Sequence, residues 1–271
     1  MKRMQLRLLH LTFTSFLIVI GCSSPEQSDY KKAQNEIAQG HFRIAMSYLD
    51  RVIKRNAPGE YPMEAAREAA RISFFEIKDF SKSIEYHRFI VLNSLNDKER
   101  LQAQKEIADI YFNNLQNYKQ AVIEYSKLQQ MPHTDAEEAQ YKMNVARAQY
   151  YQNNFFQAES EIDSLLKLKS ENAVRFSALM LKANILVGKK DYVPAAEILK
   201  NLIQEFPEKS SQENVALILA VCYEENNDFK SAIRVLEEHK SFYKPAEYIE
   251  LRIKRLQERM RNAPGAKGFR K

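Results

Sequence analysis

The hydrophobic pattern of this chain repeats at a nearly constant interval. In the stretch 190–207, the aromatic residue Tyr192 is followed by the small residue Ala195, by Leu199 and Leu202 at helical spacing, and by Pro207. The same frame recurs along the chain with these aromatics: Phe42, Phe80, Tyr118, Phe155, Tyr192 and Phe229. A small residue lies three positions after each of them: Ala45, Ser83, Ala121, Ala158, Ala195 and Ala232. Consecutive aromatics are 38, 38, 37, 37 and 37 residues apart. A fixed period of this size predicts a solenoid of stacked helix pairs.

Each copy of the repeat predicts one helix, a short turn and a second helix. In the first copy, Tyr30, Ala33 and Ile37 share one helical face, with Asp29 or Ser28 as the expected N-cap, and Gly40 ends that helix. The later first helices carry an alanine in the same part of the frame: Ala70, Ala108, Ala146, Ala183 and Ala220. The small residue of each second helix predicts a close helix crossing, because a larger side chain would hold the two backbones apart. Pro207 is expected to stop the helix before it.

The C-terminal part predicts a closing helix and a tail. Pro245 suits the first turn of a helix over 244–262. Its packing face is predicted to carry Tyr248, Ile249, Ile253, Leu256 and Met260. Solenoids need such a terminal cap. Residues 263–271 are predicted to form a basic flexible tail. With six glycines, eight prolines and no tryptophan among 271 residues, the composition favours an all-α protein.

The repeat resembles the tetratricopeptide repeat (TPR) family. In the fifth copy Ala183, Tyr192, Ala195, Leu199 and Pro207 match the family signature, and in the sixth Ala220, Tyr223, Phe229 and Ala232 do so. The period exceeds the usual ~34 residues, so we expect longer helices or turns. The resemblance implies a right-handed TPR-like solenoid of about six helix pairs over 29–243, followed by the capping helix.

The N-terminal segment, residues 1–21, has the pattern of a secretory signal. Lys2, Arg3 and Arg7 precede an apolar run from Leu8 to Ile20 that is too short to span a membrane. The run ends at Gly21-Cys22, which resembles a bacterial lipobox and implies lipid attachment at Cys22. An ordinary signal peptide with an incidental cysteine is the alternative. Residues 22–28 are then expected to form a polar tether, and Ser23 after the cysteine favours the outer membrane.

Catalytic and metal-binding patterns are missing from the sequence. No nucleophile elbow, zinc-protease motif or phosphate-binding glycine loop occurs. The histidines and the two cysteines show no metal-ligand spacing. Cys222, among apolar neighbours on a predicted helix, is expected to be a buried free thiol. We therefore expect a non-enzymatic protein without cofactor or metal.

Two surfaces are candidates for binding a partner. First helices line the concave groove of TPR arrays, and the frame places these residues on or near it: Phe75, Ile110, Asn113, Arg147, Tyr150, Tyr151 and Asn184. Such side chains suit an extended peptide or a partner helix, although Tyr150 or Tyr151 could instead pack between repeats. Met143 and Met180 stand at lysine positions of the carboxylate clamp found in chaperone-binding TPRs, so that clamp is not matched. The second surface is a basic C-terminal patch: Arg252, Arg255, Arg259 and Arg261. It suits an anionic partner, or it is a solvated helix face.

Residues 22–93 are also similar to BamD-type lipoproteins of outer-membrane β-barrel assembly. Tyr30, Ala33, Gly40, Phe42 and Ala45 carry the likeness, with Gly59-Glu60-Tyr61 and the run Arg88 to Asn93. The resemblance implies a lipid-anchored scaffold on the periplasmic face of the outer membrane that binds a β-barrel assembly component. The alternative is an adaptor or pilotin for another envelope machine, with a secretin or cell-wall enzyme as partner. Nucleic acid is not expected as a partner.

Overall fold

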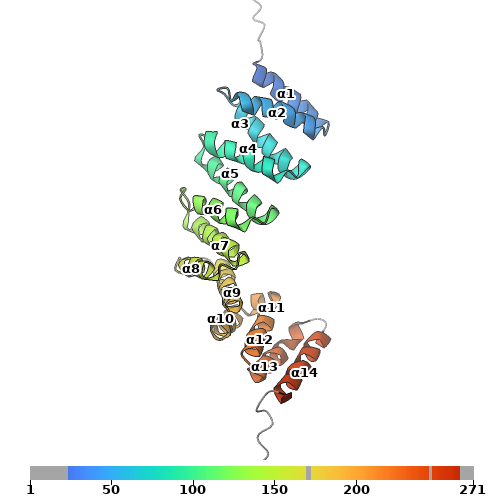
Figure 1. The fold of residues 1–271 in the computed structure, drawn as a ribbon, viewed down its shortest axis with the longest axis vertical. Coiled ribbons are helices and arrows are strands. Elements are labelled where there is room, and N and C mark those ends of the chain that lie inside the picture. Colours follow the sequence, from blue (N-terminus) through green and yellow to red (C-terminus); the bar gives the residue numbers. More distant parts are fainter. Residues whose placement is uncertain (1–23, 169–171, 244–245, 263–271) are drawn as a thin grey trace, which may run out of the picture. The chain divides into compact units, whose positions relative to one another are not determined.

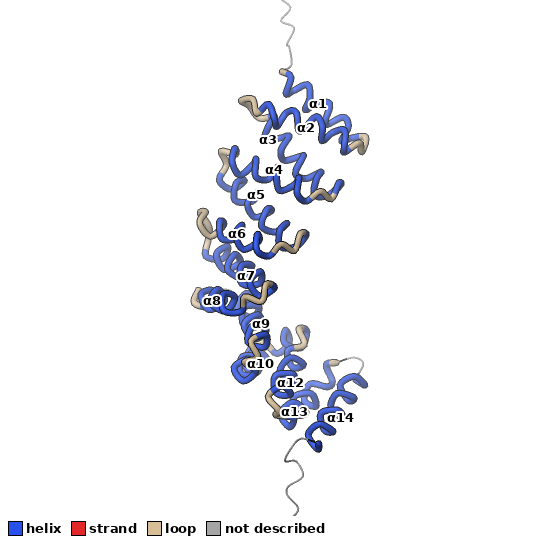
Figure 2. Tube along the Cα trace, viewed as in Figure 1, coloured by secondary structure: helices blue, strands red, loops and turns tan. Residues whose placement is uncertain are grey.

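The computed structural model describes residues 24–168, 172–243 and 246–262, and these residues fold into helices joined by short turns (Figures 1 and 2). No strand occurs in the described residues. The all-α, repeat-built architecture predicted from the sequence is therefore confirmed. Within the described ranges, no helix is both long enough and apolar enough to cross a membrane.

The chain divides into two compact units at Ile77 and Lys78. The helices of the N-terminal unit are α1 (Pro25–Ala38), α2 (Phe42–Arg55) and α3 (Tyr61–Ile72), which continues into a π-helical turn, η1 (Ser73–Ile77). Each helix packs on the next, with α2 between α1 and α3. The buried carboxylate of Asp29 on α1 accepts a hydrogen bond from Arg55 of α2 at 2.8 Å and lies 3.4 Å from Arg51.

The C-terminal unit continues the helix pairs. Its elements are α4 (Phe80–Asn93), α5 (Asp97–Asp109), the π-helical turn η2 (Ile110–Asn114), α6 (Tyr118–Leu128), α7 (Asp135–Tyr151), α8 (Phe155–Leu166), α9 (Asn172–Gly188), α10 (Tyr192–Glu205), α11 (Pro207–Gln212), α12 (Val215–Glu225), α13 (Phe229–His239), η3 (Lys240–Phe242) and α14 (Ala246–Asn262). Successive long helices pack on one another, and α14 packs on α13 (Figure 1).

The aromatic residues that define the repeat are the first residues of the second helices, α2, α4, α6, α8, α10 and α13. Two positions before each aromatic, the backbone takes a left-handed conformation: Gly40, Lys78, Gln116, Asn153, Lys190 and Asn227, with φ between 49° and 75°. The residue between is the N-cap, and in five copies it is Asp or Asn. In Asp79, Asn117 and Asp228 the side chain accepts a hydrogen bond from the helix backbone. Asx N-caps and left-handed residues are standard helix-boundary features, so the turn itself repeats.

Substitutions at the left-handed residue should change the stability in opposite directions in two copies, one that has lysine there and one that has glycine. Replacing Lys190 by glycine should raise the free energy of unfolding by roughly 0.5–1 kcal/mol, because lysine is strained at a φ of 65°. Replacing Gly40 by alanine should lower it by about 1 kcal/mol. No atom lies within 4 Å of a Cβ built on Gly40, so the cost there is conformational rather than steric. Urea unfolding of both variants checks this, and equal signs would contradict it.

Close helix crossings are built from the small residues that the frame selects. Ala45, Ser83, Ala121, Ala158, Ala195 and Ala232 are fully buried, as are their first-helix counterparts Ala33, Ala70, Ala108, Ala146, Ala183 and Ala220. In the C-terminal unit these alanines belong to a series of apolar clusters, each formed by neighbouring helices. Within each unit the predicted crossings are therefore confirmed, for α1 with α2, α5 with α6, α7 with α8, α9 with α10 and α12 with α13.

The two π-helical turns explain why two of the spacings are longer by one residue. From the buried alanine of the first helix to the left-handed residue there are seven positions in four copies, for example Ala146 to Asn153 and Ala183 to Lys190. In the second and third copies, Ala70 to Lys78 and Ala108 to Gln116 span eight. These are the copies that contain η1 and η2. A π-helical turn takes up an extra residue without shifting the contacts on either side of it.

Two expectations about the terminal helices are wrong, and the one about Pro207 is confirmed. The helix α1 begins at Pro25, with the Ser24 hydroxyl accepting from Gln27 N, so residues 25–28 of the expected tether are helical and neither Ser28 nor Asp29 is the N-cap. As expected, α10 ends at Glu205, before Phe206 and Pro207, and Pro207 then begins α11, because proline suits a first helical turn. Tyr248 is 58% exposed on α14, whereas Ile249, Ile253 and Leu256 are buried as expected. Residues 1–23, Pro245 and the predicted tail 263–271 lie outside the described residues.

Candidate functional site

An open cleft of about 640 Å³ lies in the C-terminal unit between α7, α9 and α11. The helices α7 and α9 present side chains to it from equivalent positions, counted from their buried alanines. Three residues before the alanine stand Met143 and Met180, and one residue after it stand Arg147 and Asn184. Positions separated by three or four residues share a helical face. The repeat therefore aligns two matching rows of side chains along the cleft.

The walls of the cleft combine apolar and polar groups. Met143, Met180 and Leu181 are apolar and buried or partly buried. Gln140, Ser177 and Asn184 add polar groups from α7 and α9. The remaining lining residues come from α7, from the start of α9 and from α11 with its C-cap: Tyr150, Tyr151, Ala173, Val174, Phe176, Lys209 and Glu213.

Aromatic stacking holds one edge of the cleft. Tyr151 stacks on Tyr118 of α6 with ring centroids 4.9 Å apart and is also 49% exposed. Tyr150 contacts Tyr151 and Phe155 at 5.7 and 5.9 Å. The guanidinium of Arg147 lies 5.1 Å from the centre of the Phe112 ring. Tyr151 thus packs against the preceding repeat, Tyr150 packs against Phe155 of its own repeat, and both also line the cleft.

Four of the predicted groove residues meet in this cleft: Arg147, Tyr150, Tyr151 and Asn184. Ile110 is buried to 1% exposure, so its placement on the groove surface is wrong. Asn113 is exposed on η2 but does not line the cleft, and Phe75 belongs to η1 in the N-terminal unit, 59% exposed. The lining residues that sequence reasoning missed at Gln140 and Ser177 could have been found by counting six positions back from Ala146 and Ala183. Counting did not place Lys209 and Glu213, because it assumes one continuous first helix, and in this copy that helix is divided into α11 and α12.

The basic C-terminal patch is partly engaged within the chain. Arg252 donates to the Glu224 carboxylate of α12 at 3.4 Å, and Arg259 also pairs with Glu224 while lying over the Phe229 ring. Arg255 and Arg261 are exposed, and no carboxylate of the described residues lies within ion-pair distance of either. Two of the four arginines therefore join α14 to α12 through Glu224. Cys22, the predicted lipid site, lies outside the described residues.

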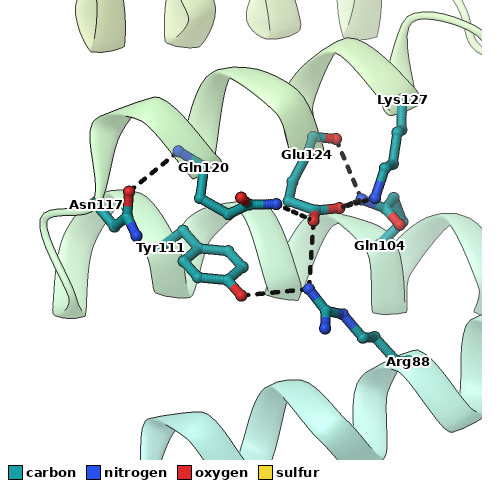
Figure 3. A network of polar contacts seen from close by, with 7 residues as sticks. All are labelled: Arg88, Gln104, Tyr111, Asn117, Gln120, Glu124 and Lys127. Carbon is teal, nitrogen blue, oxygen red and sulfur yellow. Dashed lines mark hydrogen bonds and ion pairs between the residues drawn. The ribbon is translucent and has the colours of Figure 1, made fainter. Parts of the chain in front are cut away.

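A buried carboxylate, Glu124 of α6, is the centre of a polar network with α4 and α5 (Figure 3). It accepts hydrogen bonds from Gln104 at 2.8 Å, Gln120 at 2.8 Å and Lys127 at 2.7 Å. Arg88 of α4 lies 3.5 Å from Glu124 and donates to the Tyr111 hydroxyl at 3.2 Å. Burial alone would raise the pKa of Glu124, but the three hydrogen bonds and the charge of Lys127 hold that pKa below its ordinary value. The Glu124 carboxylate therefore joins α6 to α5 and lies beside α4.

This lowered pKa predicts a pH-dependent contribution to stability. The contribution is present above the unfolded-state pKa of about 4.3 and declines as the pH falls through the lower folded-state value, because protons then bind the unfolded chain first. The difference in unfolding free energy between the wild type and Glu124→Gln should therefore shrink as the pH falls below about 4. Urea titrations of both proteins across this range measure it. A difference that stays constant with pH would contradict the assignment.

The thiol of Cys222 lies in the packed interior of the repeat. Cys222 is a free, buried thiol, as predicted, and burial raises its pKa to about 11, so it stays protonated at neutral pH. No cluster of three His, Cys, Asp or Glu side chains arranged to hold a metal ion occurs in the part of the chain that the structure describes.

The helix pairs, their small-residue crossings and the side chains on their first helices define a TPR-type fold. The tetratricopeptide repeat family model matches residues 186–252. The C-terminal part of a TPR repeat-containing protein from Cytophaga hutchinsonii is similar over 84% of this chain and 88% of that one, with 18% identity and a TM-score of 0.60. A TPR protein from Parabacteroides merdae is similar over 87% and 88%, with 14% identity and a TM-score of 0.53.

A third similar structure is that of YrrB, whose description is a TPR protein with an unusual peptide-binding site. It covers 76% of this chain and 97% of its own, with 12% identity and a TM-score of 0.53. No curated protein sequence matches this chain. At these identities the likeness establishes the fold, which is that of a TPR solenoid.

Proposed function

We propose that this chain is a non-catalytic scaffold whose cleft between α7, α9 and α11 binds a peptide segment of a partner protein. The observation that carries the proposal is the pair of matching rows on α7 and α9, which give one open cleft an apolar floor and polar rims. An extended peptide needs apolar pockets for side chains and amide or charged groups for its backbone. Met143 and Met180 supply the first, and Asn184 and Arg147 the second. The peptide-binding site of YrrB, on the same fold, supports this choice of ligand.

The cellular setting that we propose is the periplasmic face of the outer membrane. A signal peptide over 1–21 would deliver the chain across the inner membrane, and lipid on Cys22 would anchor it, since several acyl chains hold a protein firmly where one does not. The partner would be a component of β-barrel assembly, as in BamD-type lipoproteins. The second candidate is an adaptor or pilotin role with a secretin or a cell-wall enzyme. The resemblance of residues 22–93 favours the first.

Photo-crosslinking in cells tests the cleft. Photoreactive residues at Arg147, Tyr150 and Asn184 should capture one partner, and the same group at Lys200, exposed on α10 outside the cleft, should not. Capture of a β-barrel assembly protein supports the first role, and capture of a secretin or cell-wall hydrolase supports the second. If only a probe at Arg255 captures a protein, the cleft is not the partner site and the basic patch takes its place.

Lipid labelling tests the anchor separately. We expect the wild-type chain to incorporate labelled palmitate and to fractionate with the outer membrane. The variant Cys22→Ala should lose the label and the membrane association together. Labelling that persists in Cys22→Ala would exclude Cys22 as the lipid site, and an unlabelled wild type would support the ordinary signal peptide.

A further inference from the structure

The helices α11 and α12 take the place of one long first helix such as α7 or α9, because the spacing from Tyr192 to Phe229 stays at 37 residues. The short helix α11 forms one side of the cleft. It lies within the connection from α10 to α12, residues 206–214. Phe206 packs edge-to-face against Phe176 of α9 with ring centroids 5.5 Å apart. The buried hydroxyl of Ser210 donates to the Leu202 carbonyl oxygen at 2.9 Å. These contacts fix α11 against α9 and α10, so its side chains have defined positions in the cleft.

The cleft contains two cations that have no carboxylate partner. Lys209 of α11 has its Nζ 4.5 Å from the centre of the Phe176 ring, and the Arg147 guanidinium of α7 lies over Phe112. Within the described residues, neither has a carboxylate oxygen within 4.0 Å. Cation–π contacts orient a positive charge without neutralising it. Both groups therefore keep their capacity to bind an anion.

The two cations of α9 do not line the cleft and are paired, in contrast to Arg147 and Lys209. On α9 itself, Lys182 donates to Asp163 at 2.6 Å and Arg175 to Glu205 at 3.2 Å. Of the described residues that line the cleft, Glu213 is the single acid, against Arg147 and Lys209. The charge balance of the cleft is therefore positive, over a floor formed by Met143, Met180 and Leu181.

From this arrangement we propose that the cleft selects an extended peptide segment in which an Asp or Glu side chain stands beside an apolar one. The carboxylate takes the hydrogen-bond donors of Arg147 and Lys209, since charge-assisted hydrogen bonds are the stronger kind. The apolar side chain rests on the methionines, which adapt to varied shapes. Asn184 pairs with the peptide backbone. This inference rests on the proposed function and adds a preference for acidic ligands. Lys209 of α11 contributes to that preference.

The experiment uses the full-length chain in detergent and a phage library of random peptides. Peptides that it enriches are made with a fluorescent label and measured by anisotropy, each beside two relatives in which Glu or Asp is replaced by Gln or Asn, or by Lys. We expect enrichment of acidic residues next to apolar ones, and an affinity loss of ~10-fold or more when the acid is neutralised. Binding should also weaken as salt is raised.

Charge reversal at α11 gives the sharper readout. Lys209→Glu should lower the affinity for acidic peptides by ~10-fold or more and raise that for the lysine-bearing relatives. Lys200→Glu makes the same charge change on α10 outside the cleft and should leave both affinities unchanged. Thermal melting followed by circular dichroism confirms that both variants are folded.

The outcomes separate this inference from the function that it rests on. In one outcome, the peptides bind more weakly to Tyr150→Ala and Asn184→Ala but show no preference for acids and no response to Lys209→Glu. This would overturn the charge selection and leave the peptide-binding cleft in place. In another outcome, the selected peptides bind equally well to the Tyr150→Ala and Asn184→Ala variants, and the cleft probes capture no protein in cells. This would overturn both the charge selection and the peptide-binding cleft.

Discussion

Replacing Glu124 by alanine should lower the free energy of unfolding by about 3 kcal/mol. Its side chain is 1% exposed and accepts hydrogen bonds from Gln104, Gln120 and Lys127. Removing it leaves a cavity and takes a buried acceptor away from the Gln104 amide (Figure 3). Chemical denaturation of the full-length chain, followed by circular dichroism, measures the loss.

Lys127→Ala is the matched control for this prediction. Lys127 is 51% exposed and lies one helical turn from Glu124, so solvent screens their ion pair. After its removal the carboxylate retains Gln104, Gln120 and the nearby Arg88. We expect a change within about 0.5 kcal/mol. Similar losses in the two variants would mean that the surface charge, and not the buried hydrogen bonds, stabilises the contact between α5 and α6.

The repeat frame was predictable because it depends on short-range steric rules. A small residue three positions after an aromatic allows a close crossing wherever the pair recurs, and the structure buries every one, from Ala45 to Ala232. The turn before the aromatic was also encoded, in the Asp or Asn that caps five of the six second helices. Glycine did not mark this turn, because Gly40 is the one glycine among the six left-handed residues that precede the aromatics.

The cleft was predictable only as far as the frame extends. Arg147 and Asn184 follow the buried alanines by one residue in consecutive copies, so counting along the sequence places both correctly. Ile110 was misplaced because it stands two residues after Ala108, and that position is buried in the copies with regular helices too, as Ala148 and Ile185 show. Lys209 stands eleven residues before Ala220, as Asn172 does before Ala183, but it was not placed, because the first helix of this copy is divided into α11 and α12 and counting assumes one continuous helix.

The irregularity at η2 leads to the second prediction, on deleting single residues. Deleting Asn113, exposed within η2, shortens the interval from Ala108 to Gln116 to the seven positions found in the regular copies. The π-helical turn should then become α-helical, with buried contacts on both sides retained, and the unfolding free energy should change by no more than about 1 kcal/mol. Urea unfolding gives the energy, and a crystal structure of the variant shows whether the turn has become regular.

Deleting Gln149 from α7 is the control, because no extra residue is available there. The interval from Ala146 to Asn153 would fall to six positions, shorter than the seven or eight of every other copy. One missing residue rotates the following side chains by about 100° around the helix axis, so Tyr150, Tyr151 and the turn before Phe155 lose their partners. We expect a loss of at least 3 kcal/mol or failure to fold, since this displaces buried aromatic contacts. If both deletions cost the same, the π-helical turn is not an inserted residue in a regular repeat, and the longer spacing of those copies needs another cause.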